Sequence, residues 1–209
     1  MNSFKVQRTC LVAVFAALCT LAPSHAQTTK AKVIPLRPPL TSGTVQDNTY
    51  QNDSLGVQFT PPTGLKFSAP ELKGKPGTVP SLVTVAARSV ANGQAVFYAD
   101  DLGGYAEDRR STKAYVERVI RSQNQQGLDL VREEMEGHLG GATFARIDFH
   151  QTLSYEAVFV KACDAYAFVF VFASSDVASV NRLIEATTVK LDLKKSGCGS
   201  ATPDSPRNK

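Results

Sequence analysis

Three histidines and four cysteines are the residues in this chain best suited to act as bases, nucleophiles or metal ligands. Beyond residue 26 the supply is reduced to His138, His150, Cys163 and Cys198. A hydrolytic triad needs a nucleophile, a histidine and an orienting acid in contact. If Leu139–Ala142 form a turn, the two histidines lie more than ~20 Å apart, at ~3.3 Å per strand residue. That separation excludes a shared triad or metal ion.

Carboxylates supply the remaining candidates. Asp148 precedes His150 by two residues on one face of an expected strand, which suits an acid–base pair, although an exposed histidine is the interpretation we favour. Four carboxylates within Asp100–Asp108 surround two glycines, a composition that can bind calcium. Their spacing matches no known calcium loop, and Arg109 and Arg110 offset the charge, so a charged surface loop is favoured. We assign no catalytic, cofactor-binding or metal-binding residue.

Residues 1–26 have the three-part layout of a secretory signal peptide. Lys5 and Arg8 form a positive region, an uncharged apolar run follows over Cys10–Ala22, and small residues precede a cleavage site after Ala26. The apolar run is shorter than the ~20 residues that a stable membrane span needs. We therefore expect export to the periplasm or the medium, with no stable membrane span in the mature chain.

Export bears on the two cysteines that remain, Cys163 and Cys198. In an oxidising compartment two cysteines of one domain usually pair, so we predict a disulfide between them. It would close a loop of about 35 residues and stabilise the fold by roughly 3–4 kcal/mol in the chain-entropy model. A redox-active pair is the alternative, but the wide spacing and the absence of a Cys-x-x-Cys motif argue against it.

Composition excludes other function classes. The chain has 209 residues, 43% of them hydrophobic, which is typical of a globular protein. Its 23 basic and 19 acidic residues leave a net charge of only +4, whereas a nucleic-acid partner usually requires a strongly basic face. We expect no nucleic-acid partner and no cofactor, and we expect a monomer.

Segments rich in proline, glycine, serine and threonine at its two ends divide the mature chain into three parts. Residues 27–48 read as a Pro/Thr-rich disordered linker, 49–195 as a single domain, and 196–209 as a flexible tail. Within the domain, Ser111 is a helix N-cap and Gly127 a stop signal, and Ser175 or Asp176 caps a second helix.

The segment Tyr166–Ala173 is the most informative strand. Its aromatic residues alternate with small apolar ones, so both of its faces are apolar. Such a strand should be central in a sheet, with a helix packed closely on the side of the small residues. The whole pattern predicts about eight strands and two helices in an antiparallel α+β domain.

The order of these elements resembles the PsbP/Mog1/DcrB-like superfamily. The resemblance rests on Tyr50 and Asn52, the strand and turn within Leu55–Phe67, the Gly-containing turn near Gly137 and Gly141, and the closing hairpin, helix and strand. Leu65 stands where the family usually has an aromatic residue. The resemblance implies an α/β/α sandwich around an antiparallel sheet and mostly non-catalytic work, and it carries over no site residue.

Export, the missing catalytic set and the resemblance together favour a non-enzymatic binding or accessory module of the cell envelope. Such a module would recruit a protein partner or a small ligand. The alternative is a small extracytoplasmic hydrolase that uses surface carboxylates and His150.

Overall fold

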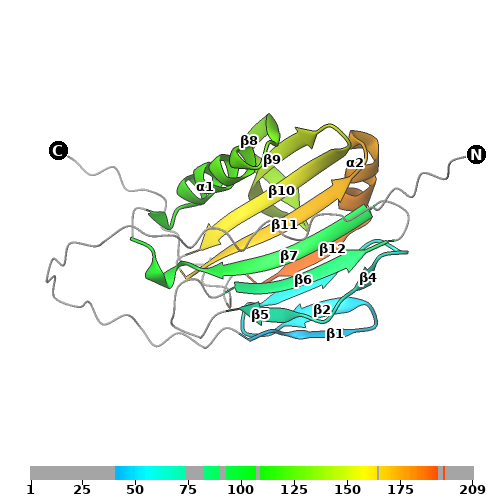
Figure 1. Cartoon of the computed structure of the whole chain (residues 1–209). Coiled ribbons are helices and arrows are strands. Elements are labelled where there is room, and N and C mark those ends of the chain that lie inside the picture. Colours follow the sequence, from blue (N-terminus) through cyan, green and yellow to red (C-terminus); the bar gives the residue numbers. More distant parts are fainter. Residues whose placement is uncertain are drawn as a thin grey trace, which may run out of the picture. The chain divides into compact units, whose positions relative to one another are not determined.

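The strands of the domain form two antiparallel sheets (Figure 1). The computed structural model describes residues 41–73, 82–89, 93–106, 109–163, 165–192 and 195. The small sheet has the order β1 (Thr44–Gln46), β2 (Thr49–Asn52), β3 (Val57–Thr60) and β12 (Thr188–Leu191). The large sheet has the order β4 (Lys66–Phe67), β6 (Leu82–Arg88), β7 (Gly93–Asp101), β11 (Tyr166–Ser174), β10 (Ser154–Cys163), β9 (Ala142–Gln151) and β8 (Asp129–Leu139). In addition, β5 (Glu71–Lys73) pairs with β6.

Strand β11 lies at the centre of the large sheet, between β7 and β10, as its sequence predicts. Its aromatic face, with Phe168, Phe170 and Phe172, belongs to a core that also contains Tyr50 and Phe59 of the small sheet. Its small-residue face belongs to a second core, on the opposite side of the sheet, which helix α1 (Thr112–Gln125) covers. The large sheet is therefore buried on both faces along β11.

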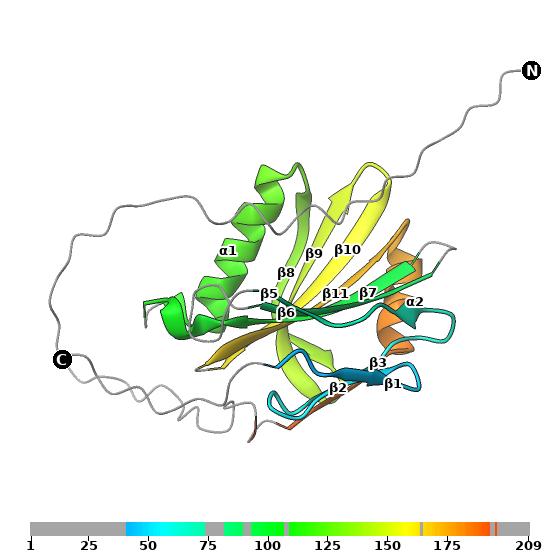
Figure 2. The ribbon, with the colours of Figure 1, turned by 60° about the horizontal axis from the view of Figure 1, so that its bottom comes forward.

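The two α-helices begin where the capping residues predict. Ser111 caps α1 by accepting a hydrogen bond from the Ala114 amide, and Asp176 caps α2 (Val177–Glu185) through the Ser179 amide. After α1, Gly127 adopts a positive φ of 79°. Figure 2 shows α1 against β8–β10, and α2 on the other side of the large sheet, together with the small sheet.

The expected α/β/α sandwich is wrong. Only α1 covers one face of the large sheet, and the other face is covered by α2 together with a complete second sheet. The described residues form twelve strands and two α-helices, so the domain is richer in strands than the pattern predicts. The error arises because β1, β2, β4 and β5 have only two to four residues each, too few to show a period.

The start of the domain also differs from the expected boundary at residue 49. Strand β1 lies inside the segment 27–48 and pairs with β2, so the folded part begins before Thr49. The expected signal peptide, the first part of the linker and the tail 196–209 lie outside the described residues. Among the residues that the structure describes, no helix is long and apolar enough to cross a bilayer.

Candidate functional site

A group of polar side chains lies beneath α1, and we call it the α1 cluster: Tyr98, Asp100, Tyr105, Tyr115 and Arg118. Tyr98 and Asp100 share one face of β7 because they are two residues apart. Tyr115 and Arg118 are neighbours on α1 because they are three residues apart. The Tyr115 hydroxyl donates to Asp100 Oδ2 over 3.3 Å. Tyr105 follows the short 3₁₀ helix Leu102–Gly104, which Asp101 caps.

The guanidinium of Arg118 lies against two aromatic rings. Its Cζ is 4.0 Å from the centroid of the Tyr105 ring and 4.5 Å from that of Tyr115. Such cation–π contacts stabilise a desolvated guanidinium. However, Nη1 and Nη2 of Arg118 and Oδ1 of Asp100 are buried without a hydrogen-bond partner in the part of the chain that the structure describes. Three orphaned polar atoms in one cluster are unusual, because each costs about 1–3 kcal/mol or more.

Two carboxyl groups on this side of the sheet hold their protons unusually tightly. Burial raises the pKa of Asp100 to about 6, although the nearby Arg118 charge opposes the shift. Burial also raises the pKa of Glu156 on β10 to about 7, and Gln123 on α1 donates to Glu156 Oε1 over 3.0 Å. Burial raises the pKa of the Tyr98 hydroxyl as well.

The sequence candidate Asp148 lies on the opposite face of the large sheet, in a separate polar network. It is only 1% exposed, although it is two residues from the exposed His150 on the same face of the strand. Arg146 donates to both of its oxygens, over 2.9 and 3.1 Å, and the Tyr155 hydroxyl donates to Oδ2 over 3.0 Å. Arg132 is 3.9 Å away. Two guanidinium groups therefore hold this carboxylate, while His150 is exposed on the same strand.

The other sequence candidates are not brought together. His138 is exposed on β8, and Asp100 and Asp101 belong to β7 rather than to a loop. Asp100 is buried, so the interpretation of a charged surface loop is wrong at this residue. Glu107 and Asp108 lie outside the described residues. In the described ranges no group of three His, Cys, Asp or Glu side chains is arranged to hold a metal ion.

The predicted disulfide is only partly visible. Cys163, at the end of β10, is disulfide-bonded, and it is the only cysteine among the described residues. Cys198 lies outside them, so the pairing Cys163–Cys198 stays a prediction.

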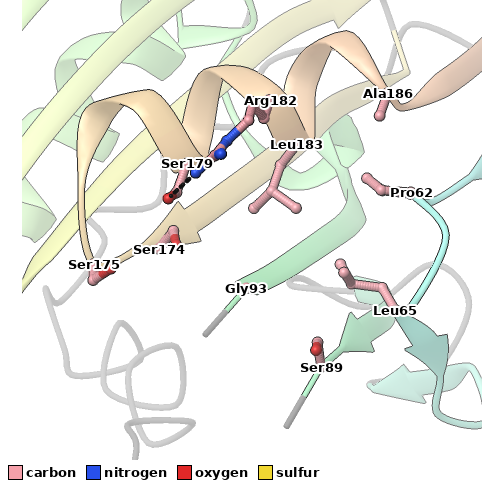
Figure 3. A pocket seen from close by; sticks show the side chains of 10 residues that line it. All are labelled: Pro62, Leu65, Ser89, Gly93, Ser174, Ser175, Ser179, Arg182, Leu183 and Ala186. Carbon is pink, nitrogen blue, oxygen red and sulfur yellow. Dashed lines mark hydrogen bonds between the residues drawn. The ribbon is translucent and has the colours of Figure 1, made fainter. Parts of the chain in front are cut away.

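A shallow pocket of about 370 Å³ opens beside α2 (Figure 3). Hydroxyl groups and one guanidinium form its polar side, and apolar side chains of α2 and of the segment before β4 form the other. Ser179 accepts a hydrogen bond from Arg182 over 3.0 Å and donates one to Asp176 over 2.8 Å. These polar groups therefore satisfy one another, and we assign them no ligand. The lining residues are Pro62, Leu65, Ser89, Gly93, Ser174, Ser175, Ser179, Arg182, Leu183 and Ala186.

The edge strand β8 is the most exposed long element. The first eight of its eleven residues are exposed, although α1 contacts part of this strand. Leu130, Val131 and Met135 are exposed by 41%, 56% and 43%. Strand β8 pairs only with β9 among the described strands, and two register shifts interrupt that ladder.

The α1 cluster was not predicted from the sequence, because a charged helix residue such as Arg118 is expected to face solvent. A signal was nevertheless present. Arg118 lies three residues after Tyr115 and four before Ser122, and both of these residues are on the buried side of the helix. Glu117 and Arg121, in contrast, are exposed. A charged residue at such a position needs a partner.

Comparison of the chain with protein-family models, curated protein sequences and solved structures finds no match. The resemblance to the PsbP/Mog1/DcrB-like superfamily therefore stays a prediction.

Proposed function

We propose that this chain is an exported, non-enzymatic binding module of the cell envelope, and that it recruits an extended, basic segment of a partner protein onto β8. The exposure of β8 carries the proposal. An edge strand presents backbone N–H and C=O groups on its outer side, and another strand can pair with them. The exposed Leu130, Val131 and Met135 offer apolar contacts to the side chains of that added strand.

Charge on β8 indicates which strand would be added. Asp129, Glu133, Glu134 and Glu136 are acidic, and Arg132 is the only Lys or Arg of this strand. Arg132 is within 4.0 Å of Glu134 and Asp148, so its charge is already compensated. A second copy of β8 would bring like charges together across the pair, which is destabilising. A strand rich in lysine or arginine would meet opposite charges instead.

Two features support export. The N-terminal 26 residues have the layout of a signal peptide. The disulfide at Cys163 is the kind of bond that persists in oxidising compartments and is rare in the cytosol.

The test is an NMR titration of the isotope-labelled chain with two synthetic peptides of equal length. One peptide alternates valine with lysine, and the other alternates valine with glutamate. We expect only the lysine peptide to shift backbone amide signals, with the shifts confined to β8 and the neighbouring β9. Binding should weaken as salt is added, because exposed charges are screened.

Matched variants make the test specific. Glu133→Lys combined with Glu134→Lys should weaken binding of the lysine peptide by roughly tenfold or more, which corresponds to about 1.4 kcal/mol. Glu117→Lys reverses an exposed charge on α1 and should leave the affinity unchanged. Equal binding of both peptides, or shifts that avoid β8, would refute the proposal.

A further inference from the structure

The described residues provide no hydrogen-bond acceptor for the terminal nitrogens of the Arg118 guanidinium. This guanidinium carries a positive charge, because arginine is not deprotonated in proteins. Both terminal nitrogens are buried and lack an acceptor within the described part of the chain. A buried cation without hydrogen bonds is costly, by more than the 1–3 kcal/mol typical of a neutral group.

The neighbouring groups do not remove this cost. The rings of Tyr105 and Tyr115 contact the guanidinium at its carbon, whereas the N–H bonds of a guanidinium point outward in its own plane. No ion pair joins Arg118 to Asp100 among the described residues, although its charge acts on the Asp100 carboxyl. Asp100 accepts from Tyr115 through Oδ2, and a hydrogen bond with Tyr105 also acts on its carboxyl, but the Oδ1 atom has no partner among the described residues.

We propose that the α1 cluster is a binding site for a small carboxylate. The two oxygens of the ligand accept hydrogen bonds from Arg118, and one of them also accepts a hydrogen bond from the protonated Oδ1 of Asp100. A planar pair of oxygens matches the fork of Nη1 and Nη2 better than a point charge does. The ligand is small because the groups that bind it are buried. Tyr105, which is half-buried, lies against the Arg118 guanidinium.

Proton balance gives the site a signature. A ligand carboxylate and an ionised Asp100 would repel each other, so each bound ligand requires one proton, taken from solvent, on Asp100. Burial, which raises the pKa of Asp100 to about 6, makes that proton available near neutral pH. The groups that act on Asp100 are Arg118 and Tyr115 of α1, Asp101 of β7, and Tyr105. Tyr98 is also in the cluster, and Glu156 of β10 acts on Tyr98.

Acetate is the probe, titrated by NMR into the full chain with its disulfide intact, at pH 6 and at pH 7.5. We expect shifts in the side-chain signals of Arg118, Tyr98 and Tyr115. Affinity should be roughly fifteenfold higher at pH 6, because the protonated fraction of Asp100 falls by about that factor between the two pH values. Sulfate at equal ionic strength should bind more weakly, since it is not planar.

Three variants separate the proposal from a structural role. Arg118→Gln should abolish acetate binding, and Arg121→Gln, an exposed arginine on the same helix, should not change it. Asp100→Asn keeps a hydrogen-bond donor without a titrating proton, so acetate should bind with an affinity that no longer depends on pH. If Arg118→Gln fails to fold, the Asp100→Asn variant still decides the question.

Several outcomes would overturn the proposal. These are equal acetate affinity at both pH values for the unmodified chain, acetate binding that survives Arg118→Gln, or equal binding of sulfate. A crystal grown in acetate with only water between Arg118 and Asp100 would overturn it as well. None of these results depends on β8, so the proposed peptide-binding function is tested separately.

Discussion

At the scale of single residues, the same chemical group behaves in opposite ways at different places in this fold. Asp176 caps α2 at the surface, and hydrogen bonds from Ser179 hold the pKa of its carboxyl below the usual value. Asp100 and Glu156 lie beneath α1, where burial disfavours the ionised form and raises their pKa values to about 6 and about 7. Because these two carboxyls lie beneath α1, the stability of the packing of α1 on the large sheet should depend on pH.

The expected consequence is a loss of stability as pH rises. The folded-state pKa values of Asp100 and Glu156 exceed the unfolded values of about 3.9 and 4.3, so the folded state binds protons more tightly. Their stabilising contribution is complete below about pH 4 and is lost as pH rises through 6 and 7. Urea unfolding between pH 4 and 8 measures it.

Glu156→Gln isolates the effect, because the amide oxygen can still accept the hydrogen bond from Gln123. We expect the free energy of unfolding of this variant to fall less steeply between pH 4 and 7. A slope identical to that of the unmodified chain would show that Glu156 is ionised in the folded state.

At the scale of elements, the turn of the β8–β9 hairpin approaches strand β12 of the small sheet at Gly140. Gly140 and Gly141 both have positive φ values, 58° and 78°. A Cβ atom on Gly140 would collide with the backbone carbonyl of Val189 in β12, whereas one on Gly141 would meet nothing within 4 Å. The close approach of two backbones, and not only the turn, therefore requires glycine at position 140.

This difference yields a matched pair of variants. Gly141→Ala should cost about 1–2 kcal/mol, the price of a left-handed backbone for a residue with a Cβ. Gly140→Ala should cost roughly 1–3 kcal/mol more, because the backbone of β12 must move. Urea denaturation of both variants measures the difference, and equal free energies of unfolding would mean that the turn and β12 are not in contact.

At the scale of the whole domain, two separate cores lie on the two sides of the large sheet, and β11 contributes to both. The hairpin of β10 and β11 runs through the centre of the sheet, and Cys163 lies at its turn. Cys163 is disulfide-bonded, and the predicted pairing with Cys198 would tie this hairpin to a segment 35 residues further along the chain.

Loss of this disulfide should destabilise the domain. Cys163→Ser should lower the free energy of unfolding by about 2–5 kcal/mol, which is the usual effect of removing a native disulfide from a small secreted domain. Non-reducing peptide mapping should connect the Cys163 peptide to the Cys198 peptide. A peptide map in which Cys198 is free would refute the predicted pairing, even if the stability effect were found.

The sequence by itself determined the features that depend on near neighbours along the chain. Ser111 and Asp176 cap their helices through residues three positions away, and β11 shows both of its buried faces in its own alternation. A β-turn or a helix cap is decided within a few residues, so local patterns suffice.

Only the tertiary structure decided what lies far apart along the chain. Strand β12 pairs with β3 across about two thirds of the chain, and this pairing creates the second sheet that the sequence did not reveal. Asp148 and Arg118 look solvated in sequence because charged residues usually are. Their burial follows from Tyr155, Arg146 and the tyrosines beside α1, which other strands and loops supply. Burial is a property of the assembled layers, and no local window contains it.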